Sequence, residues 1–203
     1  MRDICIIIPT LDKQQGEDTG RRAQISAGMD TRLVVIHDEK GQGFTKTVNA
    51  GLERTLSNED VCFLNDDIKR FSYSWLAALQ AALYAKENYG IAVPSGHCAS
   101  SMKSGRLGNT GLVLANTVPF WCALIRREVF DTIGYLDEDF IHYSSDTWFC
   151  IQARRADWRS VWVKAVYLWH EHQGSGFKSD WKIHDSDVFK QRMLETYTRD
   201  VFQ

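Results

Sequence analysis

The sequence predicts an α/β fold in which helices flank a mostly parallel, doubly wound sheet. Short apolar runs alternate with segments of helical period along the first half of the chain, as in strand–helix–strand units with parallel strands. The runs end in polar side chains, and ligands of such sheets bind beside the carboxyl ends of the strands. Because the 203 residues contain no internal repeat and no linker-like segment, we expect a single domain over 1–203.

Apolar runs without alternating polar positions define the expected strands, because strands buried on both faces are apolar throughout. In chain order, strands are expected at 4–8, 33–36, 61–64, 91–93, 120–125, 161–163 and 166–169. Helices are expected at 21–29, at 45–56, from an N-cap at Ser72 to about residue 88, and at 128–133, 145–156 and 185–197. The polar, glycine-bearing segments 11–20 and 95–109 are expected to be loops.

Composition places the chain among ordinary globular proteins, with 44% hydrophobic residues, 25% charged residues and a net charge of −2. This charge argues against indiscriminate binding to polyanions. The spacing of the five cysteines favours buried thiols in a reducing compartment over disulfides or a zinc site. No apolar run is long enough to span a membrane, so we expect a cytoplasmic protein. The cysteines are Cys5, Cys62, Cys98, Cys122 and Cys150.

Two adjacent carboxylates, Asp66 and Asp67, follow Asn65 at the end of the expected strand 61–64. Placed at the end of a buried strand, they would repel each other and lose hydration unless a cation lay between them. Mg²⁺ and Mn²⁺ prefer such oxygen ligands and are commonly held by one or two carboxylates together with substrate phosphates. The alternative is a solvated turn in which one aspartate caps the next helix.

The order of several motifs along nearly the whole chain resembles the GT-A-fold inverting glycosyltransferases, with a family-2-like, rhamnosyltransferase-type pattern. In chain order these motifs are an apolar strand ending in Pro9-Thr10, a second strand ending in Asp38, Gly43 followed by Asn49, Gly51 and Leu52, then Asn65-Asp66-Asp67, the segments 123–130 and 133–140, and His170-Glu171-His172 before Gly174-Ser175. The resemblance implies a GT-A-like domain in which 1–94 binds a nucleotide sugar and 95–203 provides acceptor binding and catalysis.

The resemblance also implies roles for individual residues. Asp67 and Asp66 would hold Mn²⁺ or Mg²⁺, with His170 or His172 as a further ligand, and His170 is favoured by its distance from Ser175. Either histidine could instead be satisfied by ordinary hydrogen bonds. The donor would be a nucleotide sugar, a UDP-sugar in the first place. Its nucleotide would be bound by a set comprising Pro9, Thr10, Asp38, Asn49, Asn65 and Asp66.

Asp146 is the candidate general base, because inversion requires a carboxylate that takes the proton of the acceptor hydroxyl. The family's catalytic helix opens with Glu-Asp and carries another Asp two residues later, whereas here Ser145 and Trp148 occupy the outer positions. Ser145 and Asp146 would also suit a helix start as capping and first-turn residues.

The acceptor is expected to contact the last third of the chain, where aromatic and basic residues alternate. Such a pattern suits a saccharide or a lipid-linked glycan, and modified DNA is the second candidate because bases stack on the same side chains. A non-catalytic nucleotide-sugar or glycan-binding module and a nucleotidyltransferase are the alternatives to a glycosyltransferase. The alternating residues are Arg154, Arg155, Trp158, Arg159, Lys164, Trp169, Lys178, Trp181 and Lys182.

Overall fold

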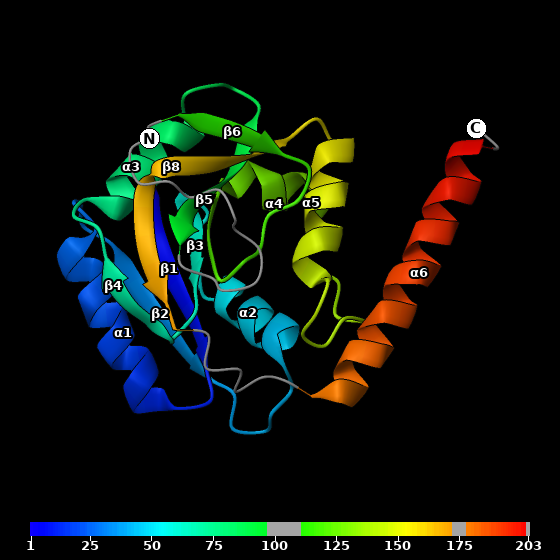
Figure 1. Cartoon of the computed structure of the whole chain (residues 1–203), viewed down its shortest axis with the longest axis horizontal. Coiled ribbons are helices and arrows are strands. Elements are labelled where there is room, and N and C mark those ends of the chain that lie inside the picture. The colour runs from blue at the N-terminus through cyan, green and yellow to red at the C-terminus, as the bar shows by residue number, and fades with distance from the viewer. Residues whose placement is uncertain (97–110, 172–177, 202–203) are drawn as a thin grey trace.

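The computed structural model describes residues 1–96, 111–171 and 178–201 of the chain (Figure 1). Its strands are β1 Asp3–Thr10, β2 Arg32–His37, β3 Glu59–Leu64, β4 Ile68–Phe71, β5 Tyr89–Gly96, β6 Leu112–Ala115, β7 Cys122–Ile125 and β8 Arg159–His170. Its helices are α1 Lys13–Ser26, α2 Phe44–Leu52, α3 Trp75–Leu83, α4 Arg127–Ile133, α5 Ser145–Arg155 and α6 Ser179–Val201. Among these helices, none is both long and apolar enough to cross a membrane.

All eight described strands form one sheet in the order β2-β1-β3-β7-β5-β8-β4, with β6 also paired to β8. The α/β class with flanking helices is confirmed, but the sheet is mixed rather than mostly parallel. β7 is antiparallel to both β3 and β5, and β4 and β6 are antiparallel to β8. The sequence could not reveal this, because a strand buried on both faces is apolar whichever way it runs.

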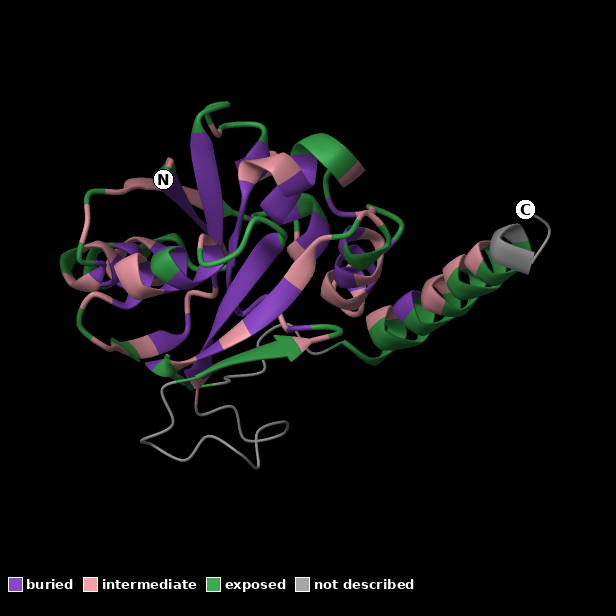
Figure 2. Cartoon of the chain, turned by 90° about the horizontal axis from the view of Figure 1, so that it is seen from above, coloured by how far each residue is buried: buried purple, intermediate pink, exposed green. Residues whose placement is uncertain are grey.

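Helices cover both faces of the sheet, and each face has its own hydrophobic core. One core joins α1 and α3 to the sheet through residues such as Ala23, Trp75 and Leu79. The other joins α2, α4 and α5 through residues such as Val48 and Phe149. The strands between these layers are largely buried, whereas α6 is largely exposed and extends away from the sheet (Figure 2). The segments 1–94 and 95–203 share this sheet, because β7 inserts between β3 and β5.

Helix α1 occupies most of the segment that was expected to be a loop. Asp12 caps it by accepting a hydrogen bond from the backbone N–H of Gln15 at 3.1 Å. Its buried face consists of small residues, among them Gly16 and Gly20, which lie against Thr10 and Leu33. The helix packs so closely on the sheet that large apolar side chains would not fit. This absence of apolar periodicity concealed the helix in the sequence.

The helix expected to start at Ser72 starts later, at Trp75, with Ser74 as its N-cap residue. Ser72 instead bonds to strand β8, because its backbone N–H donates to the carbonyl of Tyr167 at 3.2 Å. The short strands β4 and β6 were also missed. Both strands pair with β8, which lies far along the chain, so no local sequence pattern indicates them.

Four of the five cysteines lie in the described part of the chain, and all four are free and buried, as the sequence predicts. Burial raises the pKa of the Cys5 thiol to about 12, so the thiol is protonated and unreactive at neutral pH. Cys98 lies outside the described residues.

Candidate active site

The carboxyl ends of β1, β2 and β3 meet at one edge of the sheet and bring three predicted residues together. The Thr10 hydroxyl donates a hydrogen bond to Oδ2 of Asp66 at 2.5 Å. The backbone N–H of Asp38 donates to the Thr10 carbonyl at 2.8 Å. Pro9, also assigned to nucleotide binding, lies in β1 opposite Ile36 of β2. The parallel pairing of β1 with its two neighbours produces this convergence.

Asp66 is held between β1 and α1. Its backbone carbonyl accepts hydrogen bonds from the Thr19 hydroxyl at 2.6 Å and from the Gln15 amide at 3.4 Å. Burial raises the pKa of the Asp66 carboxyl, the hydrogen bond from Thr10 lowers it, and the neighbouring charge of Asp67 raises it further. Thr19 and Gln15 were not predicted to belong to the site, because the segment carrying them was expected to be a loop.

Asp67 pairs with His170, the last residue of β8. Oδ1 of Asp67 lies 2.8 Å from Nε2 of His170. The backbone supports this approach, because Ile68 pairs with His170 and the Glu171 N–H donates to the Asp67 carbonyl at 3.2 Å. Both residues are largely buried, with 9% of Asp67 and 4% of His170 exposed. Sequence reasoning favoured His170 over His172 as a further metal ligand beside Asp67, and the side chains of Asp67 and His170 are in contact.

Trp121 fixes the orientation of the His170 imidazole. The two rings are stacked, with 5.1 Å between their centroids and 18° between their planes. The indole is 7% exposed and belongs to the core, in line with a packing role. Gly96 makes room for it, since a Cβ there would lie 2.6 Å from Cη2 of Trp121. The Trp121 carbonyl also accepts a hydrogen bond from the Asn65 N–H at 2.8 Å, so Trp121 contacts both His170 and Asn65.

The Asp67–His170 pair suits a divalent cation in part. Carboxylate oxygen and imidazole nitrogen both ligate Mn²⁺, while Mg²⁺ prefers oxygen alone. Within 1–96, 111–171 and 178–201, no group of three or more His, Cys, Asp or Glu side chains is arranged to hold a metal. The described residues therefore offer two candidate ligands here, and substrate phosphates would have to supply others. His172, the other histidine proposed as a ligand, lies outside the described residues.

Asp38 organises the loop that follows β2. Its carboxylate oxygens accept hydrogen bonds from the N–H groups of Gln42 at 2.8 Å and Gly43 at 2.9 Å. Gly43 has φ +98°, and a Cβ there would collide with the carbonyl of Ile141, so only glycine fits. The carboxylate is 7% exposed. The Asp38 carboxylate therefore determines the conformation of the loop beside Thr10. A bound nucleotide could donate hydrogen bonds only to the remaining lone pairs of this carboxylate.

Asn49 does not fit the nucleotide-binding role that was assigned to it. Its Nδ2 donates to the Leu136 carbonyl at 2.8 Å and to Oε1 of Glu138 at 3.0 Å. Its Oδ1 accepts from the Leu136 N–H at 3.2 Å. The side chain is 5% exposed, and these bonds use both amide protons. Asn49 thus ties α2 to the segment before α5.

Replacement of Asn49 by alanine is expected to destabilise the protein by about 1–3 kcal/mol, because the buried N–H and carbonyl of Leu136 lose their partner. Urea unfolding would measure this change, with the exposed Asn58→Ala variant as a matched control. Affinity for a nucleotide should be unchanged in folded protein. Wild-type stability combined with weaker nucleotide binding would restore the role predicted from the sequence.

Asp146 lies in the first turn of α5, where its carboxylate contacts the backbone of Phe120. Its Oδ1 accepts from the Thr147 N–H at 2.6 Å, and its Oδ2 accepts from the Phe120 N–H at 3.4 Å. Burial raises the pKa of the Asp146 carboxyl, and these hydrogen bonds partly oppose the rise. Phe120 and Trp121 are adjacent in the chain, so Asp146 is connected to the Asp67–His170 pair through two consecutive residues.

The two residues that replace the outer acids of the family motif are both buried, with Ser145 3% and Trp148 7% exposed. Neither side chain therefore offers a polar surface to an acceptor. Asp146 is the one acidic residue of α5.

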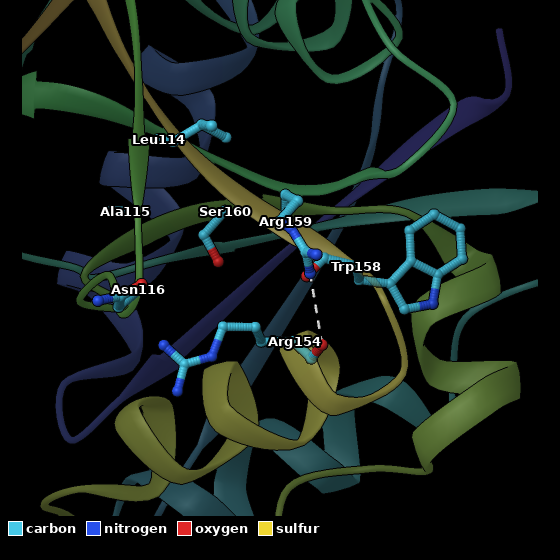
Figure 3. A pocket seen from close by; sticks show the side chains of 7 residues that line it. All are labelled: Leu114, Ala115, Asn116, Arg154, Trp158, Arg159 and Ser160. Carbon is cyan, nitrogen blue, oxygen red and sulfur yellow. Dashed lines mark hydrogen bonds between the residues drawn. The ribbon is translucent and has the colours of Figure 1, made fainter.

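The aromatic and basic residues of the last third do not form one surface. Arg154, Trp158 and Arg159 line a pocket of about 330 Å³ between α5, β6 and β8, where the indole points away from the other side chains (Figure 3). This pocket lies at the start of the 12-residue strand β8, whereas His170 ends that strand. Lys178 and Trp181 lie at the start of α6, with Nζ of Lys178 3.9 Å from the indole centroid.

No family model matches the chain. A curated protein of Sinorhizobium fredii (strain NBRC 101917 / NGR234), the uncharacterized protein y4gI, is 25% identical over 174 residues. The match covers 73% of this chain and 19% of that protein, so the chain spans about a fifth of its relative's length.

Solved structures of glycosyltransferases share the fold. GalNAc-T7 with UDP, GalNAc and Mn²⁺ is similar at a TM-score of 0.62 and 12% identity, over 84% of this chain and 44% of that one. The mannosyltransferase PcManGT from Pyrobaculum calidifontis, in complex with GDP-Man and Mn²⁺, is similar at a TM-score of 0.60 and 12% identity. This match covers 98% of this chain and 66% of that one. The catalytic domain of Drosophila β1,4-galactosyltransferase 7, in complex with xylobiose, is similar at a TM-score of 0.59 and 14% identity. This match covers 88% of this chain and 74% of that one. The chain therefore has a GT-A-like glycosyltransferase fold.

Proposed function

We propose that this protein is a metal-dependent inverting glycosyltransferase, which moves a sugar from a nucleoside-diphosphate donor to an acceptor hydroxyl. The approach of Asp67 to His170, 2.8 Å apart beside Asp66 and Thr10, carries the proposal. The fold supports it, because two of the similar structures hold Mn²⁺, one with UDP and the other with GDP-Man. A UDP-sugar is the first donor to test.

On the donor side, Asp67 and His170 would hold the cation together with the donor's diphosphate. The cation would act as a Lewis acid and offset the negative charge that develops on the leaving diphosphate. Stacking on Trp121 keeps the imidazole in a fixed orientation, so the ligand pair is preorganised. Asp66, Thr10 and Asp38 would line the nucleoside pocket at the carboxyl ends of β1–β3, with Asn65 beside them.

On the acceptor side, Asp146 would take the proton of the attacking hydroxyl. The acceptor oxygen forms a bond to the anomeric carbon while the bond from that carbon to the diphosphate oxygen breaks, and the proton passes to the carboxylate. Burial raises the pKa of Asp146, which makes the carboxylate a stronger base than an exposed aspartate. The hydrogen bonds from Thr147 and Phe120 hold the carboxylate in one orientation.

A saccharide or a lipid-linked glycan is the proposed acceptor. Phe44, His142 and Trp181 form a chain of ring contacts, with centroid separations of 6.2 Å and 5.9 Å, and Lys178 adds a cation to it. This group lies beside the segment that leads into α5. Aromatic rings and a cation at this place suit sugar rings that carry hydroxyl or acidic groups.

Incubation with Mn²⁺ and a panel of nucleotide sugars tests the proposal. Metal-dependent release of the nucleoside diphosphate would support sugar transfer, and proton NMR of the glycoside product would report whether the anomeric configuration is inverted. Release of pyrophosphate would indicate a nucleotidyltransferase instead. Binding without turnover would indicate a non-catalytic module. DNA binding that weakens steeply with salt and is lost in Lys178→Glu would move the acceptor to nucleic acid.

A further inference from the structure

Asp185 is a completely buried carboxylate on a helix that is otherwise largely exposed. It lies near the start of α6, and its exposed fraction is 0%. Among the described residues, neither hydrophobic core includes a residue of this helix. Burial of a carboxylate is costly unless the group is paired or hydrogen-bonded, so its position calls for a specific set of partners.

The partners are three successive backbone N–H groups. Ile141 donates to Oδ1 at 2.8 Å, while His142 and Tyr143 donate to Oδ2 at 2.8 Å and 2.6 Å. Nδ1 of His184 lies 3.1 Å from Oδ1. Burial alone would raise the pKa of Asp185, but these hydrogen bonds outweigh it and lower the pKa, so the group is ionised at neutral pH.

The segment held in this way leads directly into the helix of Asp146. Ser144 follows it with φ +62°, a strained left-handed conformation for a residue with a side chain, and α5 begins at the next residue. On its other side the segment bonds to α2, because the Thr45 N–H donates to the Ile141 carbonyl at 3.2 Å. The start of α5 is therefore held from both sides.

A second contact ties α6 to the same region. The Arg192 guanidinium donates to Oδ2 of Asp137 at 2.8 Å and also pairs with Asp139. These acids lie in the segment that precedes the one bound by Asp185. Helix α6 thus holds two successive parts of the connection between α4 and α5.

We infer that Asp185 is a positioning residue for the transfer reaction, which holds 141–143 so that α5 presents Asp146 to the acceptor hydroxyl. This inference rests on the proposed function. Asp185 acts through the backbone of the loop, and its hydrogen-bond partners include neither Asp67 nor His170. We therefore expect donor binding at that pair to change little when Asp185 is replaced.

The test compares Asp185→Asn with wild type. The amide nitrogen of Asn cannot accept a hydrogen bond, so at least one of the loop N–H groups loses its partner. We expect kcat to fall by about 10–100-fold, because a small displacement of a reacting group costs that much. Affinity for UDP with Mn²⁺ should stay within about twofold of wild type. Hydrogen exchange should become faster at 141–143.

Asp187→Asn is the matched control, since this exposed aspartate on the same helix pairs only at the surface with Lys190. This variant should leave kcat, the affinity for UDP with Mn²⁺ and the hydrogen exchange at 141–143 unchanged. If Asp185→Asn does not fold, Asp185→Glu gives the same readouts with the charge retained. A folded variant with normal kcat, or with unchanged exchange at 141–143, would overturn the inference. If the wild type transfers no sugar, the proposed function fails, while hydrogen exchange still reports whether Asp185 holds the loop.

Discussion

Asp146→Asn is expected to reduce turnover by about two to four powers of ten, the usual contribution of general base catalysis. The amide has the same shape, but it cannot take a proton, and its single oxygen can replace only one of the two carboxylate oxygens that accept from Thr147 and Phe120. Donor affinity should be nearly unchanged, because the Asp67–His170 pair is intact. Steady-state kinetics and calorimetric titration with UDP and Mn²⁺ would measure the two quantities.

Asp157→Asn is the matched control for this variant. It changes another aspartate just beyond the end of α5, one whose side chain is 95% exposed. Asp157 has φ +66°, a conformation that asparagine tolerates, so the control should fold and turn over normally. Near-normal turnover of Asp146→Asn would remove Asp146 from the mechanism, and Asp137 and Asp139 would be the next acids to test.

The same variant should also change how stability depends on pH. Burial raises the pKa of Asp146 in the folded state above its value in the unfolded chain. The folded protein then binds more protons than the unfolded one between these two pKa values, so stability falls as pH rises through that interval. Asparagine does not titrate, so the variant should lack this fall in stability. Thermal unfolding across the acid range would check it, and an equal fall in the melting temperatures of wild type and variant would contradict the assigned pKa shift.

The second large effect is expected at the cation site. Asp67→Ala should abolish Mn²⁺-dependent binding of a nucleoside diphosphate, because it removes the carboxylate that lies 2.8 Å from His170. Wild type should melt at a higher temperature when Mn²⁺ and UDP are both present, since a ligand that binds only the folded state stabilises it. Calorimetry with Mn²⁺ or with EDTA would measure binding directly, without any requirement for turnover.

Asp18→Ala, on the exposed side of α1, is the matched control for loss of an aspartate. It should bind the nucleotide as wild type does. Equal affinity of wild type in Mn²⁺ and in EDTA, or of Asp67→Ala and wild type in Mn²⁺, would show that neither the cation nor this carboxylate takes part in binding.

Local patterns were sufficient to predict the half of the sheet that carries the acidic pair. The apolar runs of β1 and β3 are buried along almost their whole length, and the polar residues that follow them lie together at one edge. The position of a strand buried on both faces can be read from the sequence, because most of its residues form a continuous apolar run. Thr10, Asp38 and Asp66 could be placed beside one another for this reason.

Contacts between residues that are distant in the chain could be identified only from the tertiary structure. The contact of Asp67 with His170 depends on β4 pairing with β8, and the antiparallel course of β7 places Trp121 over the imidazole. Asn49 has the right residue type for a nucleotide ligand, yet its amide is used on Leu136. Hydrogen bonds of this kind have no sequence signature, since any backbone group can be the partner.

The sequence by itself thus determined the α/β class, the main buried strands and the residues at their carboxyl ends, because burial and periodicity are properties of short segments. Only the tertiary structure decided the directions of β4, β6 and β7 and the helical state of 13–26. It also decided the hydrogen bonds between the Asp185 carboxylate and the backbone of 141–143. These features depend on close packing and on pairings between segments far apart in the chain. Their energies arise only when the whole domain has assembled.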